Sequence, residues 1–216
     1  TGSTHGIGFS IVKKLNEYGC EVALNSRSQN SLKKAKKLIG ENIYGIVGDM
    51  SNKENTKAAV NEFINHFGSI DILICNVGSG RSASPLKETI LDWEESISKN
   101  LMTAINPISE SISFLAKTKG SIICISSICG EKMIQEAPLT YSSTKAALNR
   151  YVANSAYYFA KNKIRINAVS PGNVYFPGSI WEKKLKEDQK LVKKMLRNNV
   201  PLNKFVSAED VAEAVA

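Results

Sequence analysis

Two side chains able to exchange a proton, those of Tyr141 and Lys145, lie four residues apart in the segment Tyr-Ser-Ser-Thr-Lys. On a helix, residues at this spacing leave the same face about one turn apart. A free phenol, with a pKa of about 10, is a poor proton donor at neutral pH, whereas a fixed positive charge beside it favours the phenolate and lowers the pKa. The spacing therefore predicts either an acid-base pair or, as in many helices, a solvated surface pair.

A glycine-rich stretch, residues 2–8, precedes the first segment with helical periodicity. Glycines at such a place allow a tight turn and the close approach of backbone N–H groups to a pyrophosphate, whose charge is also met by the helix N-terminus. The spacing G-x-x-x-G-x-G differs from the G-x-G-x-x-G of the standard dinucleotide fingerprint. By itself, the stretch fits a phosphate-binding turn and an ordinary loop before a helix equally well.

Short β-rich runs alternate with segments of helical period, which is typical of a parallel sheet with helices on both faces. We therefore expect a three-layer α/β/α arrangement. The predicted strands are residues 21–25, 44–48, 71–76, 121–126 and 165–169. A long helix is predicted around residues 101–115, where Pro107 should kink or split it. Ser51 with Glu54 predicts a capping box at the start of another helix.

Composition excludes several functional classes. The chain has 216 residues, a hydrophobic content of 43% and a formal net charge of +8. The lysines are spread over many segments with few aromatic residues between them, so nucleic-acid binding is not expected. The denser basic runs, 33–37 and 183–194, fall in amphipathic stretches and are typical of solvated helix faces. The four cysteines lack metal-ligand spacing, so no metal site is expected.

The chain is expected to form one domain over residues 1–216. No apolar run is long enough for a membrane span and no secretory signal is recognisable, which favours a cytoplasmic protein. The sequence begins at Thr1, inside the glycine turn, and stops at Ala216, inside a helix that starts at Ser207. Since a sheet of this kind has a strand before that turn, we expect its first strand and its C-terminal strand to be absent from residues 1–216.

Four motifs occur in a fixed order along the chain. They are Thr1-Gly2-Ser3-Thr4-His5-Gly6-Ile7-Gly8, Asn76-Val77-Gly78, Tyr141-Ser142-Ser143-Thr144-Lys145 and Pro171-Gly172. In this order and spacing, over essentially the whole length, they resemble the motifs of the short-chain dehydrogenase/reductase family, and in particular its 3-oxoacyl-carrier-protein reductase-like members. The resemblance implies a Rossmann-type doubly wound parallel sheet and an NAD(P)-dependent oxidoreductase that reduces a carbonyl to an alcohol or catalyses the reverse.

The resemblance also implies a cofactor-binding set. Its members are Gly2, Ser3, Thr4, His5, Gly6, Ile7, Gly8, Ser26, Arg27, Asp49, Met50, Asn76, Val77, Gly78, Tyr141, Lys145, Pro171, Gly172 and Val174. No acidic residue follows strand 21–25 to accept hydrogen bonds from a ribose 2′-hydroxyl, whereas Arg27 offers donors to a 2′-phosphate. NADP(H) is therefore favoured, with NAD(H) as the alternative. The chain departs from the family in Tyr175-Phe176-Pro177-Gly178, where a threonine commonly helps to hold the cofactor.

For catalysis, the resemblance implies a tetrad of Asn100, Ser127, Tyr141 and Lys145. Ser126 is the alternative to Ser127, because one additional residue separates Ser127 from Tyr141 relative to the common pattern. Strand alternation places these two serines on opposite faces, so only one can readily face a substrate. Tyr141 would give its proton to the developing alkoxide, and the serine would stabilise the charge on the oxygen. Lys145 would lower the pKa of Tyr141 and hold the nicotinamide ribose, and Asn100 would position a water.

The substrate class stays open between three functions. The first is a carbonyl reductase or alcohol dehydrogenase acting on a small molecule, with anionic and carrier-linked substrates among the possibilities. The second is a sugar or polyol dehydrogenase of a biosynthetic pathway, and the third is a non-catalytic nucleotide-binding protein with the same fold. By analogy with the family, a homodimer or homotetramer is expected, without a membrane or nucleic-acid partner.

Overall fold

The computed structural model describes residues 1–40 and 43–216, and it shows the predicted alternation of strands and helices. The strands are β1 (Ala23–Ser26), β2 (Tyr44–Val47), β3 (Ile72–Cys75), β4 (Ser121–Ile125), β5 (Arg165–Val169), β6 (Val174–Tyr175) and β7 (Val206–Ser207). The helices are α1 (Gly6–Glu17), α2 (Gln29–Ile39), α3 (Lys53–Phe67), α4 (Ile90–Ile97), η1 (Ser98–Met102), α5 (Thr103–Thr118), η2 (Ile128–Gly130), α6 (Leu139–Ala160), α7 (Ile180–Glu187), α8 (Gln189–Asn199) and α9 (Ala208–Val215). All five predicted strands are present, and their ends differ from the prediction by at most two residues.

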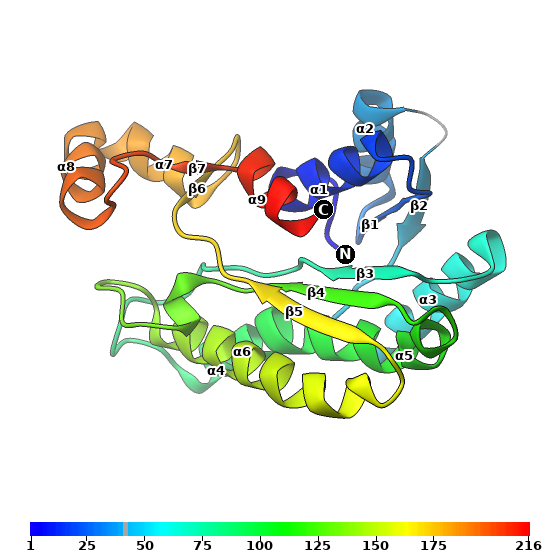
Figure 1. Cartoon of the computed structure of the whole chain (residues 1–216). Helices are drawn as coiled ribbons and strands as arrows, with labels where there is room; N and C mark the ends of the chain where they lie inside the picture. The colour runs from blue at the N-terminus through cyan, green and yellow to red at the C-terminus, as the bar shows by residue number, and fades with distance from the viewer. Residues whose placement is uncertain (41–42) are drawn as a thin grey trace.

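The parallel strands of the described residues form three hydrogen-bonded sheets, of which β6-β7 is a short two-stranded one (Figure 1). Another sheet pairs β1 with β2, and the third has the order β3-β4-β5, with Cys75 opposite Cys124 and Cys124 opposite Ala168. Within the described residues no strand lies between β1 and β3. A cavity of about 430 Å³ lies there, lined by apolar side chains that include Val22, Ile46 and Leu73. The prediction of a strand before the glycine turn concerns residues outside this chain and stays a prediction.

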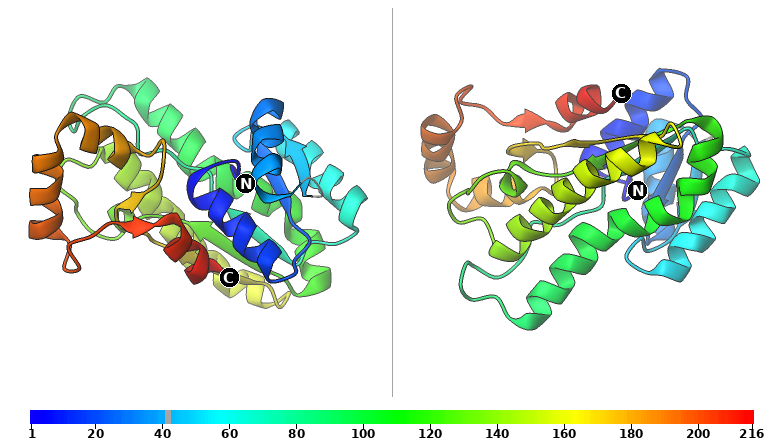
Figure 2. Two further views of the ribbon diagram at one scale, coloured as in Figure 1. Left: turned by 90° about the horizontal axis from the view of Figure 1, so that it is seen from above. Right: turned by 60° about the horizontal axis from the view of Figure 1, so that its bottom comes forward.

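Helices cover both faces of the β3-β4-β5 sheet, which gives three layers (Figures 1 and 2). On one face, α5 and α6 pack against the sheet through Leu115 and Leu148, which are fully buried with Ile122 of β4. On the other face, α1 and α9 pack against each other and against Ile125 of β4. Because β4 is covered on both sides, its sequence Ser-Ile-Ile-Cys-Ile is nearly continuous in apolar residues, as expected for a central parallel strand.

The predicted split of the long helix at Pro107 is wrong. Helix α5 runs through Pro107 from Thr103 to Thr118. The irregularity lies one turn earlier, in the π-helical segment η1, which follows α4 directly and leads into α5. A π-helical turn is wider than an α-helical one and often occurs at functional sites. Here it contains Asn100, which is buried.

Two helix starts illustrate how side chains decide the local structure. The N-cap of α3 is Asn52, whose side chain accepts a hydrogen bond from the backbone N–H of Asn55, so the capping box predicted from Ser51 is wrong. Ser51 bonds to Asp49 instead. The start of α9 at Ser207 agrees with the prediction, since Ser207 and Asp210 form a reciprocal capping box there.

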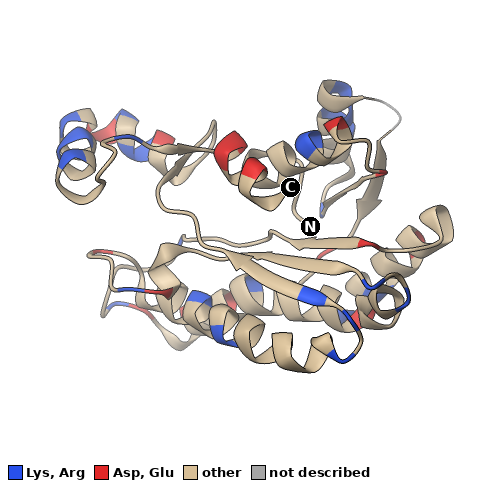
Figure 3. Ribbon diagram, in the orientation of Figure 1, with Lys and Arg blue, Asp and Glu red and all other residues tan. Residues whose placement is uncertain are grey.

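Helices α7 and α8 pack on each other at one end of the molecule, away from β1 and β2 (Figures 1 and 2). Figure 3 shows that lysine and arginine residues gather on these two helices. Lys183 and Lys186 form ion pairs with Glu187 and Glu182 one turn away, and both lysines are largely exposed. This arrangement agrees with the solvated helix face predicted for the run 183–194. Among the described residues, no helix has the length and apolar character needed to cross a membrane.

Candidate active site

Helix α6 brings Tyr141 and Lys145 to the carboxyl ends of the strands, one turn apart as predicted. Lys145 is only 2% exposed, and its Nζ donates a hydrogen bond to the carbonyl oxygen of Ile125, the last residue of β4, at 2.8 Å. The same Nζ lies 6.0 Å from the centre of the Tyr141 ring. The two residues are therefore not a solvated surface pair, because the ammonium is enclosed between the helix and the sheet.

The acidities of this pair differ from the sequence-based expectation. Burial raises the pKa of Tyr141 above its ordinary value, and a hydrogen bond with Ser127 offsets this only in part. The pKa of Tyr141 is therefore raised, whereas the sequence predicted that Lys145 would lower it. Burial instead lowers the pKa of Lys145 from 10.5 to about 8. At neutral pH the phenol is protonated and the lysine still carries most of its charge.

The two candidate serines have different surroundings. Ser127 is the N-cap of η2, where its Oγ accepts a hydrogen bond from the backbone N–H of Cys129 at 3.2 Å, and its hydroxyl is near enough to the phenol to lower the pKa of Tyr141. Ser126 is turned the other way, and its hydroxyl lies 3.5 Å from the backbone carbonyl oxygen of Lys145. The geometry brings Ser127 to the phenol and leaves Ser126 in a packing position, which favours Ser127 as the member of the tetrad.

Asn100 reaches the same place from η1. Its Oδ1 accepts a hydrogen bond from the backbone N–H of Ser79 at 2.7 Å, and its Nδ2 donates to Ser96 at 3.1 Å. A Cβ atom at Gly78 would lie 3.0 Å from the Nζ of Lys145 and 3.2 Å from the Oδ1 of Asn100. The absence of a side chain at Gly78 thus leaves room for the lysine and the asparagine to approach each other.

The glycine turn is bonded to the sheets that contain β1 and β3. Gly2 donates its N–H to the side-chain oxygen of Asn25 at 3.0 Å, and Ser3 and Asn25 exchange hydrogen bonds at 2.9 Å. On the other side, the amide of Asn76 donates to the carbonyl oxygens of Thr1 and Gly2, both at 3.0 Å. Ser3 and Asn76, both predicted to bind the cofactor, therefore hold the turn in shape through their side chains.

Space around the glycines is limited by the backbone itself. A Cβ atom at Gly8 would lie 2.4 Å from the amide nitrogen of Asn76 and 2.8 Å from the carbonyl oxygen of Gly2. Gly2 and Gly6 have φ angles of +58° and +57°, a conformation that favours glycine. These positions explain why three glycines occur at this spacing.

The N-terminus of α1 is open to an anion. His5 occupies the N-cap position without a side-chain hydrogen bond to the helix, and the first turn contains no acidic residue. With Thr4 and Ile7, it places backbone N–H groups at a helix end whose dipole favours negative charge. The ring of Phe176 lies against Gly6, with its nearest atom 2.6 Å from where a Cβ would stand. The residue that replaces the family's threonine thus contacts the turn directly.

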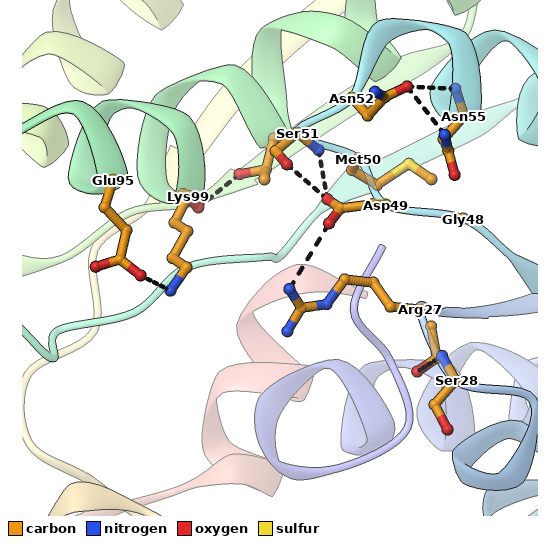
Figure 4. A network of polar contacts seen from close by, with 12 residues as sticks. Arg27, Ser28, Gly48, Asp49, Met50, Ser51, Asn52, Asn55, Glu95 and Lys99 are labelled. Carbon is orange, nitrogen blue, oxygen red and sulfur yellow. Dashed lines mark hydrogen bonds and ion pairs between the residues drawn. The ribbon is translucent and has the colours of Figure 1, made fainter. Parts of the chain in front are cut away.

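The carboxyl ends of β1 and β2 carry a second polar group of residues, drawn in Figure 4. The guanidinium of Arg27 lies 3.6 Å from the carboxylate of Asp49. The hydroxyl of Ser26 accepts a hydrogen bond from the N–H of Ser28 and supports the turn before α2. Met50 is 4% exposed and its side chain packs in the core, so only its backbone could reach a ligand, contrary to a side-chain role.

The fourth motif, Pro171-Gly172, lies after β5. The carbonyl oxygen of Pro171 accepts a hydrogen bond from the N–H of Ile128, which ties the segment Pro171-Gly172 to the loop that follows Ser127. Val174 is buried and pairs with Val206 in the short β6-β7 sheet. Val77, from the second motif, accepts a hydrogen bond from Thr103 through its carbonyl oxygen at 3.3 Å. All the predicted motifs therefore gather along the carboxyl edge of the strands.

Comparison with known proteins identifies the family. A sequence model of the family described as Enoyl-(Acyl carrier protein) reductase matches residues 2–216. The chain belongs to the short-chain dehydrogenase/reductase family. This short-chain dehydrogenase/reductase is 31% identical to 3-oxoacyl-[acyl-carrier-protein] reductase FabG of Aquifex aeolicus (strain VF5) over 220 residues, which cover 100% of the chain and 86% of the relative. It is 27% identical to glucose 1-dehydrogenase 2 of Bacillus subtilis (strain 168), over 100% of the chain and 84% of that protein.

Solved structures support the same assignment. The structure described as ElxO with NADP bound is 25% identical and superimposes with a TM-score of 0.91, covering 100% of this chain and 87% of the other. A short chain oxidoreductase from Pseudomonas aeruginosa PAO1 with NADPH bound has a TM-score of 0.91 at 23% identity, covering 99% and 85%, and supports the fold. The predicted Rossmann-type, three-layer α/β/α fold is confirmed, and the protein is a member of an oxidoreductase family.

Sequence reasoning missed several residues of this short-chain dehydrogenase/reductase site. Asn25 bonds to the glycine turn on one side as Asn76 does on the other, and each is the last residue of a predicted strand, which could have been the signal. Thr144 and Ser96 are joined by a buried hydroxyl contact of 3.2 Å, and Ser96 in turn accepts from Asn100. This series of hydrogen bonds links the helical segments that carry the tetrad residues. Isolated serines and threonines on helices form no recognisable sequence pattern, so the contacts could not be predicted.

Proposed function

We propose that the chain catalyses the NADP(H)-linked reduction of a carbonyl group to an alcohol, or the reverse, with Tyr141 as the general acid or base. The observation that carries the proposal is the meeting of four polar side chains at one edge of the sheet. The phenol of Tyr141 lies beside the Ser127 hydroxyl, while Lys145 and Asn100 converge at Gly78 within the same site. Such a set can polarise an oxygen and give it a proton.

The N-terminus of α1 and the polar side chains around Tyr141 together fit a dinucleotide. The open N-terminus of α1 suits a pyrophosphate, the glycine positions have no room for side chains, and Arg27 lies at the end of β1. At the other end, Lys145 and Asn100 could hold ribose hydroxyls and a water. When bound, a nicotinamide dinucleotide supplies the hydride.

The residues of the chain supply proton transfer and charge stabilisation. Ser127 can donate a hydrogen bond to a carbonyl oxygen and stabilise negative charge on it. Tyr141 can then deliver its proton to that oxygen. Because burial raises the pKa of Tyr141, the phenol is protonated at neutral pH, which suits the reductive direction. Lys145 keeps most of its positive charge at neutral pH and, beside the ring, can bind the hydroxyl groups of a nicotinamide ribose.

NADP(H) is the proposed cofactor, and NAD(H) is the alternative. Arg27 is a surface guanidinium at the end of β1, where a 2′-phosphate would be received. Solved relatives with NADP and NADPH bound share the fold over nearly the whole chain. Both findings favour the phosphorylated cofactor.

Two substrate classes follow from the relatives. The 3-oxoacyl-[acyl-carrier-protein] reductase and the glucose 1-dehydrogenase differ by only a few per cent in identity to this chain. We therefore propose a 3-oxo thioester as the first substrate to examine and an aldose as the second. Initial rates with NADPH and a 3-oxoacyl thioester, and with NADP and glucose, would separate them.

Substitution of Tyr141 tests the central assignment. Tyr141→Phe should reduce turnover at least about 100-fold, since general acid catalysis contributes that much or more, and should leave NADPH binding nearly unchanged. Tyr157→Phe is the matched control, because Tyr157 lies on the same helix and is exposed. A Tyr141→Phe enzyme with most of its activity would refute the acid assignment. Failure of the unmodified chain to bind either cofactor would refute the enzymatic proposal as a whole.

We also propose that the protein assembles as a homodimer or homotetramer. Helices α4 and α6 carry apolar side chains that are exposed in the single chain, namely Ile90, Leu91, Ile97, Tyr157 and Tyr158. Covering such side chains is favourable at about 25 cal/mol per Å² of apolar surface. Light scattering coupled to gel filtration measures the molar mass, and a mass equal to one chain at micromolar concentration would contradict this proposal.

A further inference from the structure

A negatively charged side chain lies beside the guanidinium of Arg27, the proposed binding group for a 2′-phosphate. Its Nη1 lies 3.6 Å from Oδ2 of Asp49, the closest carboxylate to it among the described residues (Figure 4). Arg27 comes from the end of β1 and Asp49 from the loop after β2, so the contact joins two adjacent strands. The side chain of Arg27 is 73% exposed and that of Asp49 is 36% exposed.

The carboxylate is held more firmly than the guanidinium. Oδ1 of Asp49 accepts hydrogen bonds from the backbone N–H of Ser51 at 2.9 Å and from the Ser51 hydroxyl at 2.7 Å. These bonds leave Oδ2 to face Arg27. Partial burial raises the pKa of Asp49, but the hydrogen bonds from Ser51 and the charge of Arg27 outweigh burial and lower it overall. The group is therefore ionised at neutral pH.

We propose that Asp49 is a specificity-determining residue that limits the preference for NADPH over NADH, because its fixed carboxylate neutralises Arg27 and repels a 2′-phosphate. The inference rests on the proposed function and concerns the same cofactor site. A phosphate with nearly two negative charges is attracted by Arg27 and repelled by Asp49 at once. The 2′-hydroxyl of NADH carries no charge, so it is neither attracted by the charge of Arg27 nor repelled by that of Asp49. The chain thus discriminates between the cofactors less than Arg27 alone would predict.

The ratio of the dissociation constants for NADH and NADPH isolates this effect. Asp49 also lies where the family contacts the adenine ring, so its replacement can weaken both cofactors, but such a loss is common to both and cancels in the ratio. Asp49→Asn removes the charge and keeps the side-chain volume. We expect the ratio to shift about three- to tenfold toward NADPH. Interactions between exposed charges are weak, but the 2′-phosphate carries nearly two negative charges.

The variant Arg27→Ala provides a second, independent test of the repulsion by Asp49. With Arg27 absent, the repulsion from Asp49 is no longer compensated, so the variant should bind NADPH more weakly than NADH rather than bind the two equally. The double variant Arg27→Ala/Asp49→Asn should bring the ratio back toward one. Because Arg27 is largely exposed, its replacement leaves the core unchanged, and this arm decides the question even where Asp49→Asn folds poorly.

Binding is measured by isothermal titration of the full chain with NADPH and with NADH, at low and at high salt. Glu17→Gln is the matched control, since it removes a carboxylate from another exposed ion pair, that with Lys13 on α1. An unchanged ratio in Asp49→Asn, a shift toward NADH, or equal affinities in Arg27→Ala would each overturn the inference. If the unmodified chain binds neither NADPH nor NADH, the proposed function itself is overturned.

Discussion

The buried charge of Lys145 is needed for the proposed reaction but lowers the free energy of unfolding. The substitution Lys145→Met tests both effects. The ammonium is almost completely buried, and its only hydrogen-bond partner among the described residues is the carbonyl oxygen of Ile125. Burial lowers the pKa of Lys145 from 10.5 to about 8. Lys145→Met keeps much of the side-chain length and removes both the charge and its titration.

The magnitude follows from the two pKa values. One pKa unit corresponds to about 1.4 kcal/mol, so the buried charge lowers the free energy of unfolding by about 3 kcal/mol at pH 7. Between pH 8 and 10.5 the unfolded chain binds more protons at this residue than the folded chain, so stability rises with pH in this window. Above about pH 10.5 Lys145 is neutral in both states and the penalty is gone.

Methionine cannot donate to the Ile125 carbonyl, and a buried carbonyl without a partner costs about 1–3 kcal/mol at every pH. We therefore expect Lys145→Met to be as stable as the unmodified chain, or more stable, at pH 7. It should become less stable near pH 10.5. The difference between the two proteins should change by about 3 kcal/mol across the window, while turnover is lost throughout.

Urea unfolding of both proteins at half-unit steps from pH 7 to pH 10.5 measures the difference. Other tyrosines, cysteines and lysines titrate in this range, but they are common to both proteins and cancel. Lys57→Met, at an exposed position of α3, is the control for replacing a lysine by methionine outside the core. A difference for Lys145→Met that stays constant with pH would refute the reasoning from burial.

Three further predictions concern single contacts. Gly78→Ala places a methyl group 3.0 Å from Nζ of Lys145, so kcat/KM should fall about 10- to 100-fold in steady-state assays while the melting temperature changes little. Phe176→Thr removes the ring from Gly6 and restores a hydroxyl, so NADPH should bind about 3- to 10-fold more tightly by titration, the worth of one hydrogen bond. Asn106→Leu removes the amide that donates to the carbonyl oxygens of Met50 and Ser51 at 3.0 and 3.1 Å, of which Met50 keeps a bond from the Thr56 hydroxyl, and should lower the free energy of unfolding by about 1–3 kcal/mol in urea.

Much of the fold could be predicted from the sequence, because parallel strands buried on both faces give continuous apolar runs. Strand β5 was predicted at its observed ends, residues 165–169. The behaviour of Pro107 could not be predicted, since it depends on the π-helical turn before α5 and on packing against α3 and β3. The N-cap of α3 was misplaced because Ser51 bonds to Asp49, a contact that residue spacing alone does not reveal.

For the site, spacing predicted which residues meet but not their acidities. The sequence placed Tyr141 and Lys145 on one helical face, and the structure agrees. The direction of the pKa shift of Tyr141 was wrong because it depends on burial, which balances the effect of nearby charge and cannot be read from residue types. The pairing of Arg27 with Asp49 likewise required knowing that the ends of β1 and β2 are adjacent.

At the carboxyl edge, the glycine turn bonds to Asn25 of β1 and to Asn76 after β3. A dinucleotide held by Arg27 at one end and Lys145 at the other would pass over this turn and contact residues that follow both strands. Hydrogen exchange should then slow together in the sheets that contain β1 and β3 when NADPH binds, because local opening of either sheet would require release of the same ligand.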